Sequence, residues 1–194
     1  MLNYKKLLIL RLSSLTEWKN ENEMIIPEEM RKDFCWAQTS EILGDGKYIL
    51  RGYRESGQIY WEETWENEQQ HGLDCYWYEN GYKDWETAYK DGQLHGFDIR
   101  WHKNGQMLWK IKYQNGLRHG LSIGWYENGN QKWRTDSWQD NEIHGSSLGW
   151  HKNGQLKWKA EYQNGLQHGL NLGWYEDGRP ECKEEWKNGK LIGV

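Results

Sequence analysis

Apolar and polar residues alternate along most of this chain, in short runs separated by turn-forming residues. After each His-Gly pair the first, third and fifth residues are mostly apolar, as at Leu121, Ile123 and Trp125. After each Asn-Gly pair the bulky residues fall at the even positions, as at Trp109 and Ile111. A two-residue period is that of a β-strand with one buried face. The pattern therefore predicts many short strands, each with one apolar side.

The same run of residues returns with successive spacings of 24, 24, 25, 24 and 24 positions. The His-Gly pairs begin at His71, His95, His119, His144 and His168, and Ile192-Gly193 takes the sixth place. A second turn divides most units, as at Asn115-Gly116 and Asn164-Gly165. We therefore predict six units of two strands, in an array of internal repeats. The turn glycines that keep this rhythm are Gly57, Gly81, Gly105, Gly129, Gly154 and Gly178.

One unit is a residue longer than the others. The additional residue lies between Trp133 and Trp138. A strand accommodates one additional residue as a β-bulge, which we predict at this place.

The alternation also predicts the length of the first turn. With a two-residue turn, Trp125 would lie opposite Lys132, and the apolar rows of the two strands would point to opposite sides. A three-residue loop over 127–129 instead pairs Trp125 with Gln131 and places Trp125 and Trp133 on the same side. The apolar pattern favours the three-residue loop.

The same reasoning predicts a three-residue loop at Gln114-Asn115-Gly116, so that all strands share one aromatic face. The sheet must then curl, or a second molecule must cover it, because so large an aromatic surface is not left open to water. A homodimer is one way to cover it. The tryptophans expected on this face are Trp77, Trp85, Trp101, Trp109, Trp125, Trp133, Trp150, Trp158 and Trp174.

Residues 1–47 contain no recognisable copy of the repeat. Leu8, Leu12 and Leu15 fall on one helical face, and Pro27 begins a second predicted helix. We expect a partly helical N-terminal cap or partner-contacting segment at 1–47, followed by a β-repeat domain at 48–194. The predicted fold is an all-β repeat protein, an elongated single-layer antiparallel meander of about six two-strand units of 24 residues.

Composition agrees with this fold and limits the functions. Fifteen Trp and 22 Gly stand against two Phe and two Pro, a balance typical of short strands and glycine turns. The net charge is −4 and the lysines and arginines are not clustered, which disfavours nucleic acid and anionic membranes as partners. Three cysteines without CxxC spacing, and no signal peptide or membrane span, indicate free thiols in the cytoplasm, with one disulfide as the alternative.

The histidines of the His-Gly pairs invite a metal site, but equivalent positions lie two strands apart, roughly 9–10 Å, too far for one zinc ion. We predict that they support turns, and we expect no metal, no cofactor and no catalytic site, because no nucleophile is paired with a base outside the repeated positions. The structural turn residues are Gly81, Gly105, Gly129, Gly154 and Gly178, with His95, His119, His144 and His168.

A line of amphipathic aromatic residues follows the strands that end in Trp. Aromatic residues with a polar group are typical of protein-contact surfaces, and they also pack across strands. Both interpretations stay open. The candidate partner-binding residues are Tyr78, His102, Tyr126, His151 and Tyr175.

The repeat runs from Tyr113 through Asn115-Gly116 and His119-Gly120 to Trp125-Tyr126 and Asn128-Gly129. It resembles the MORN-repeat superfamily, and more closely the bacterial variant repeat of MORN-repeat antitoxin-like proteins. The resemblance covers 48–194 and implies an elongated single-layer sheet that binds proteins. The chain departs from the usual pattern by using Trp in place of Tyr or Phe, and at Asn67-Glu68, Asp140-Asn141 and Cys182.

The leading hypothesis is a cytoplasmic bacterial protein that is not an enzyme and that binds a protein partner. The resemblance implies that the partner is a toxin and that this chain is an antitoxin or immunity protein. A carbohydrate- or choline-binding cell-wall module is an alternative, because Gly-Trp hairpins also line such repeats. A structural scaffold that pairs with a second copy is another.

Overall fold

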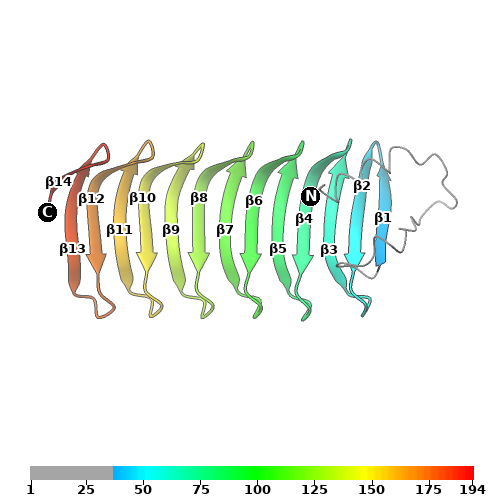
Figure 1. The fold of residues 1–194 in the computed structure, drawn as a ribbon, viewed down its shortest axis with the longest axis horizontal. Helices are drawn as coiled ribbons and strands as arrows, with labels where there is room; N and C mark the ends of the chain where they lie inside the picture. Colours follow the sequence, from blue (N-terminus) through cyan, green and yellow to red (C-terminus); the bar gives the residue numbers. More distant parts are fainter. Residues whose placement is uncertain (1–36) are drawn as a thin grey trace, which may run out of the picture.

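The computed structural model describes residues 37–194, which form one antiparallel sheet of 14 strands in sequence order (Figure 1). Each strand pairs only with its neighbours in the chain, so the sheet is a meander, and no helix occurs in the described part. The strands are β1 (Ala37–Gly44), β2 (Lys47–Tyr53), β3 (Ile59–Glu66), β4 (Gln69–Trp77), β5 (Lys83–Lys90), β6 (Gln93–Trp101), β7 (Met107–Gln114), β8 (Leu117–Trp125), β9 (Gln131–Gln139), β10 (Glu142–Trp150), β11 (Leu156–Gln163), β12 (Leu166–Trp174), β13 (Pro180–Lys187) and β14 (Lys190–Gly193).

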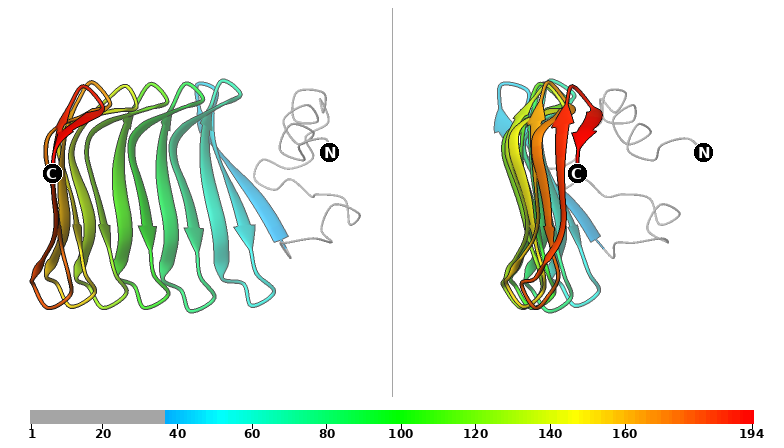
Figure 2. Two further views of the ribbon diagram at one scale, coloured as in Figure 1. Left: turned by 60° about the vertical axis from the view of Figure 1, so that its left-hand side comes forward. Right: turned by 90° about the vertical axis from the view of Figure 1, so that its left-hand side faces the viewer.

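The sheet is a single layer with curved strands (Figure 2). It begins at Ala37, before the expected boundary at Tyr48, and β1 therefore belongs to the sheet. Of the cap expected at 1–47, residues 37–47 lie in β1, the turn after it and the start of β2, and residues 1–36 lie outside the described residues. No helix in the described part could cross a membrane.

The first turn of each unit has the predicted three-residue loop. The Gly129 amide donates to the Tyr126 carbonyl at 2.9 Å, and the Tyr126 amide donates to the Asn130 carbonyl at 2.8 Å. Gly129 has φ +86°, which only glycine adopts without strain. Trp125 pairs with Gln131, as predicted from the alternation.

The second turn of each unit is shorter than predicted. Gln114 pairs with Leu117, so only Asn115 and Gly116 form the turn. Both have positive φ, +50° and +82°, as in a type I′ turn. The three-residue loop predicted here is wrong. A type I′ turn has the twist of the strands it joins, and Asn-Gly is the pair that forms it most readily.

The additional residue of β9 forms the predicted bulge. Gly120 pairs with Trp138 and Ser122 pairs with Thr135. Between these two pairs the chain advances three residues in β9 but only two in β8, so β9 contains one additional residue. The neighbouring units lack this residue, and Gly96 and Phe97 of β6 pair in unbroken register with Tyr113 and Lys112.

The prediction of one shared aromatic face is wrong. Trp125 pairs with Gln131, but the next residue back, Gly124, pairs with Trp133. Lys132 is therefore an unpaired bulge residue, and it sends Trp133 to the face opposite Trp125. The same shift recurs in the other first hairpins. One face, the packed face, has Trp85, Trp109, Trp133 and Trp158; the other, the open face, has Trp77, Trp101, Trp125, Trp150 and Trp174.

The packed face has a small core of buried residues that is covered by side chains of the same face. A row of small residues crosses the middle of the strands, and its members pair side by side. Ala160, for example, lies between Trp158 and Tyr162 of its own strand and is 3% exposed. Ser122 is 2% exposed. Rows of aromatic side chains on either side exclude water from this row, so a single layer has a core without a second sheet.

Candidate functional site

The open face presents a regular series of apolar stripes. Each even-numbered strand from β4 to β12 contributes its last residue and those two and four positions before it, as at Leu121, Ile123 and Trp125 of β8. In β10 the first of these three positions is polar, because it holds Ser146. The outermost residue of four of these stripes is exposed. These residues are Leu73 (44%), Phe97 (41%), Leu121 (39%) and Leu170 (39%).

Charged residues stand between the apolar stripes. In the middle row of the open face, Ile123 of β8 pairs with Lys110 of β7 on one side and Arg134 of β9 on the other. Leu172 pairs in the same way with Lys159 and Lys183. Neighbouring strands are about 4.8 Å apart, so apolar and cationic stripes alternate at that spacing.

Acidic residues neutralise the cations in the first strands. Arg51 lies between Glu41, at 2.7 Å, and Glu62, at 2.6 Å. Hydrogen bonds to these two carboxylates raise the pKa of Arg51. Lys83 is paired with Glu86 at 2.6 Å. Arg51 and Lys83 on the first strands are therefore both paired with carboxylates.

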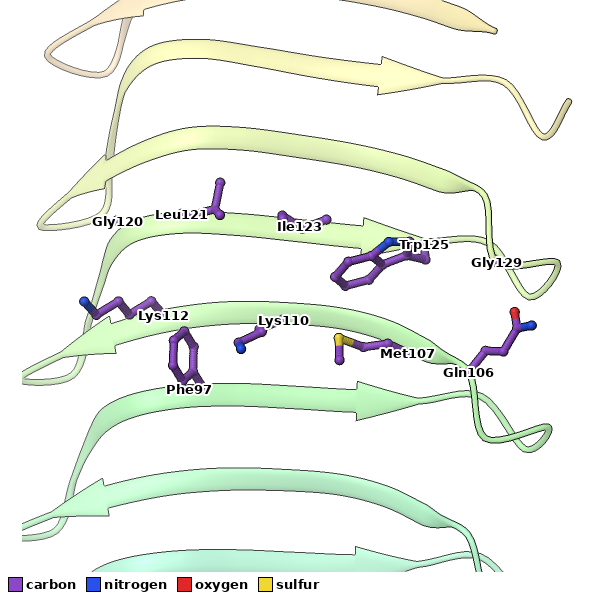
Figure 3. Close-up of a pocket in the computed structure, with 10 residues that line it drawn as sticks. All are labelled: Phe97, Gln106, Met107, Lys110, Lys112, Gly120, Leu121, Ile123, Trp125 and Gly129. Carbon is purple, nitrogen blue, oxygen red and sulfur yellow. The ribbon is translucent and has the colours of Figure 1, made fainter. Parts of the chain in front are cut away.

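A groove of about 740 Å³ crosses the open face over β6, β7 and β8 (Figure 3). Apolar side chains from all three strands line it, together with two lysines of β7. The Lys110 ammonium lies 4.0 Å from the centre of the Phe97 ring, in a cation–π contact. The lining side chains drawn in the figure include Phe97, Met107, Lys110, Lys112, Leu121, Ile123 and Trp125.

The line of tyrosines and histidines links consecutive units. The Tyr126 hydroxyl donates to the Trp150 carbonyl at 2.8 Å, and Tyr78 donates to Trp101 at 2.8 Å. His102 and His151 place Nε2 at 3.5 and 2.8 Å from the corresponding carbonyls of Trp125 and Trp174. These four side chains are half-buried, and the polar group of each already contacts a backbone carbonyl of the next unit. The geometry favours packing between units over partner contact for them.

Tyr175 differs from the other members of this line. It is 47% exposed, and its hydroxyl has no hydrogen bond within the described part of the chain. Its ring lies 5.8 Å from the Arg179 guanidinium. Among the five predicted partner-binding residues, only Tyr175 is open to a partner.

A second series of hydrogen bonds, made by asparagine side chains, links the first turns of consecutive units, and it was not predicted from the sequence. Asn128 Nδ2 donates to the Lys152 carbonyl of the next unit at 3.0 Å, and its Oδ1 accepts from the Asn130 amide at 3.1 Å. Asn80, Asn104 and Asn153 make the same pair of contacts. The Asn before each turn glycine was a visible signal, because Asn often binds the backbone two residues ahead.

The turn glycines lie where the sequence placed them, but the His-Gly pairs lie inside strands. Gly81, Gly105, Gly129, Gly154 and Gly178 all lie in first turns with φ between +83° and +89°. His95, His119, His144 and His168 instead lie within β6, β8, β10 and β12. There the register shifts against the preceding strand, and the following glycine has positive φ. These histidines therefore accompany bulges and not turns.

The described residues also show whether side chains could bind a metal ion and whether the cysteines are free. No group of three His, Cys, Asp or Glu side chains in residues 37–194 could hold a metal ion. Cys75 and Cys182 are free thiols, the first buried and the second exposed. Burial raises the pKa of Cys75 to about 11. Cys35 lies outside the described residues.

No protein-family model matches the chain, and no curated protein matches it. The function must therefore be inferred from the surface of the sheet.

Proposed function

We propose that this protein is a non-enzymatic interaction module that binds one partner protein along the open face of its sheet. The observation that carries this proposal is the series of exposed apolar residues at Leu73, Phe97, Leu121 and Leu170. They recur on one face, between charged stripes, and a surface of apolar patches with polar surroundings is typical of protein interfaces.

The size of the surface favours a macromolecule. The stripes from β4 to β12 span nine strands, which at about 4.8 Å each gives a length of roughly 40 Å. Protein interfaces cover about 800 Å² on each partner, which a surface of this length can provide. The packed face is less suited, because its aromatic rows bury one another.

The proposal also covers the class of the partner and the compartment in which the protein acts. The resemblance of the repeat to bacterial MORN-repeat antitoxins suggests that the partner is a toxin and that this chain neutralises it by binding. The free thiols Cys75 and Cys182 support a reducing compartment such as the cytoplasm.

A capture experiment with two matched variants tests the proposal. In the first, Leu121→Glu and Leu170→Glu place charges on the open face. In the second, Ile42→Glu and Tyr82→Glu change two exposed apolar residues elsewhere. We expect the full chain and the second variant to retain one stoichiometric protein from a lysate of the native host, and the first variant to lose it.

Circular dichroism would establish that both variants keep the sheet. Equal capture by the two variants, or no stoichiometric protein on the unmodified chain, would overturn the proposal. Where a partner is retained, growth of cells expressing it with and without this chain tests the toxin part.

A further inference from the structure

The β7 strand differs from the odd-numbered strands that follow it. On the open face, Arg134 of β9 is paired with Asp136 at 2.8 Å, and Lys159 of β11 with Glu161 at 3.3 Å. Each carboxylate lies two residues after its cation. In β7 the corresponding position holds a second cation, Lys112, after Lys110.

Neither lysine of β7 has an ion pair within residues 37–194. Their surroundings are apolar, since the groove around them is lined by Phe97, Leu121 and Trp125. Two adjacent cations in an apolar groove repel one another, and an anion that enters the groove relieves this repulsion. The chain as a whole has a net charge of −4, so this positive site is a local exception.

We propose that this groove receives an amphipathic α-helix of the partner protein. The apolar row of the helix packs on Leu121, Ile123 and Trp125, and carboxylates along one side of that row pair with Lys110 and Lys112. This inference depends on the proposed function, because it specifies which part of a protein partner the open face binds.

The backbone amides and carbonyls of a helix form hydrogen bonds within the helix, whereas those of an extended segment need partners from another strand. The β7 strand pairs with β6 on one side and β8 on the other, so no strand edge is free in the groove. An extended segment lying on the face would leave its amides and carbonyls without partners from the sheet. A helix needs only side-chain contacts, as in other helix-in-groove complexes.

The spacing of the two stripes fits the surface of a helix. Residues two apart on a strand are separated by about 6.7 Å, and helical residues four apart by about 6 Å, so two carboxylates on one side of a helix can reach both lysines. From Leu121 to Trp125 the apolar stripe is about 13 Å long, or roughly two and a half helical turns. The cationic stripe lies one strand away, about 4.8 Å, as a flanking row requires.

Fluorescence anisotropy with a designed peptide tests this inference. The probe is a fluorescein-labelled peptide of about 20 residues, long enough to span the strands. It has Leu at helical spacing, Glu along one side of the Leu row and Ala elsewhere. The matched peptide has Lys in place of every Glu. We expect the full chain to bind the Glu peptide at least about ten-fold more tightly than the Lys peptide.

Two double variants locate the site. Reversal of charge in Lys110→Glu/Lys112→Glu should weaken the Glu peptide by about ten-fold or more and strengthen the Lys peptide. Lys103→Glu/Lys152→Glu makes the same change in net charge at exposed turn residues and should leave both affinities unchanged. Retention of Glu-peptide binding by the first variant, or no saturable binding to the full chain, would overturn the inference.

Two further probes separate a helix from anions in general. A single-stranded oligonucleotide and phosphatidylserine vesicles should bind weakly, and equal binding of either through Lys110 and Lys112 would overturn the inference. Failure here is distinct from failure of the proposed function. If Leu121→Glu/Leu170→Glu loses the native partner while the peptide does not bind, the interaction surface stands and only the helix is wrong.

Discussion

The indole of Trp133 lies directly over Gly124 of the neighbouring strand. A Cβ atom added to Gly124 would overlap Nε1 and Cε2 of this indole. Trp158 lies over Gly149 in the same way. Neither glycine has positive φ, so both are needed for space and not for backbone conformation.

Substitution Gly124→Ala should therefore destabilise the sheet. The methyl group must displace a large ring from the packed face, and we expect a loss of about 1–3 kcal/mol in the free energy of unfolding. Urea denaturation followed by tryptophan fluorescence would measure it. Gly193→Ala is a matched control, because a Cβ there meets Glu185 only at 3.5 Å. An equal loss in both variants would show that the ring is not the cause.

Substitution Tyr126→Phe tests the link between units. It removes the hydrogen bond to the Trp150 carbonyl and leaves that carbonyl without this donor, for an expected loss of about 1 kcal/mol. Tyr175→Phe removes a hydroxyl that has no partner in the described part of the chain and should have no effect. Urea denaturation of the two variants compares them directly. A stable Tyr126→Phe variant that fails to bind the partner would instead support the contact role.

Substitution Glu68→Gly should stabilise the protein. Glu68 has φ +64° in the turn between β3 and β4, a conformation that costs a side-chain-bearing residue about 1 kcal/mol. Glycine relieves this strain. The reverse change, Gly116→Glu, places a side chain at φ +82° in the equivalent turn and should destabilise by a similar amount. Thermal unfolding with both variants should show shifts of opposite sign.

The two described thiols should differ in reactivity. Burial raises the pKa of Cys75 from about 9 to about 11, and only the thiolate reacts with iodoacetamide. At pH 8 we expect exposed Cys182 to be alkylated quickly and Cys75 slowly, as measured by peptide mass spectrometry. Because the pKa of Cys75 is raised on folding, its contribution to stability is complete below pH 9 and is lost as the pH rises toward 11. Equal rates of alkylation would contradict the burial of Cys75.

Acid should weaken the last hairpins. The Glu184 carboxylate accepts a hydrogen bond from the Trp186 indole at 3.0 Å and another from the Asn171 side-chain amide at 2.8 Å. These two bonds lower the pKa of Glu184. A lowered pKa stabilises the folded state above the pKa of the unfolded chain, and this stability is lost as the pH falls through the folded value. Glu184→Gln should therefore show a smaller loss of stability between pH 5 and pH 3. Parallel pH profiles for the variant and the unmodified chain would contradict this.

Local signals were enough for much of the fold. Gly129 follows Asn128 at the first turn, and the alternation around Trp125 correctly predicted the loop and its pairing with Gln131. The additional residue in β9 correctly predicted a bulge. In each case the residues that decide the geometry lie within a few positions of one another.

The candidate site could not be predicted from the same signals. The line from Tyr78 to Tyr175 was found in the sequence, but its bonds to the next unit depend on distances between turns. The groove depends on Lys112 lying beside Lys110 on the same face as Phe97 and Leu121. Those residues belong to three strands, and their common face depends on the bulges between them.

The sequence by itself determined the period, the hairpins and the direction of the meander, because turn residues and alternation act locally. Only the tertiary structure decided which tryptophans share a face. Lys132 and its equivalents each add one unpaired residue, and one residue moves a strand's side chains to the opposite side. The alternation of Met107, Trp109 and Ile111 reads the same with or without such a bulge. What selects it is the empty space over Gly124, which an indole from the next strand fills.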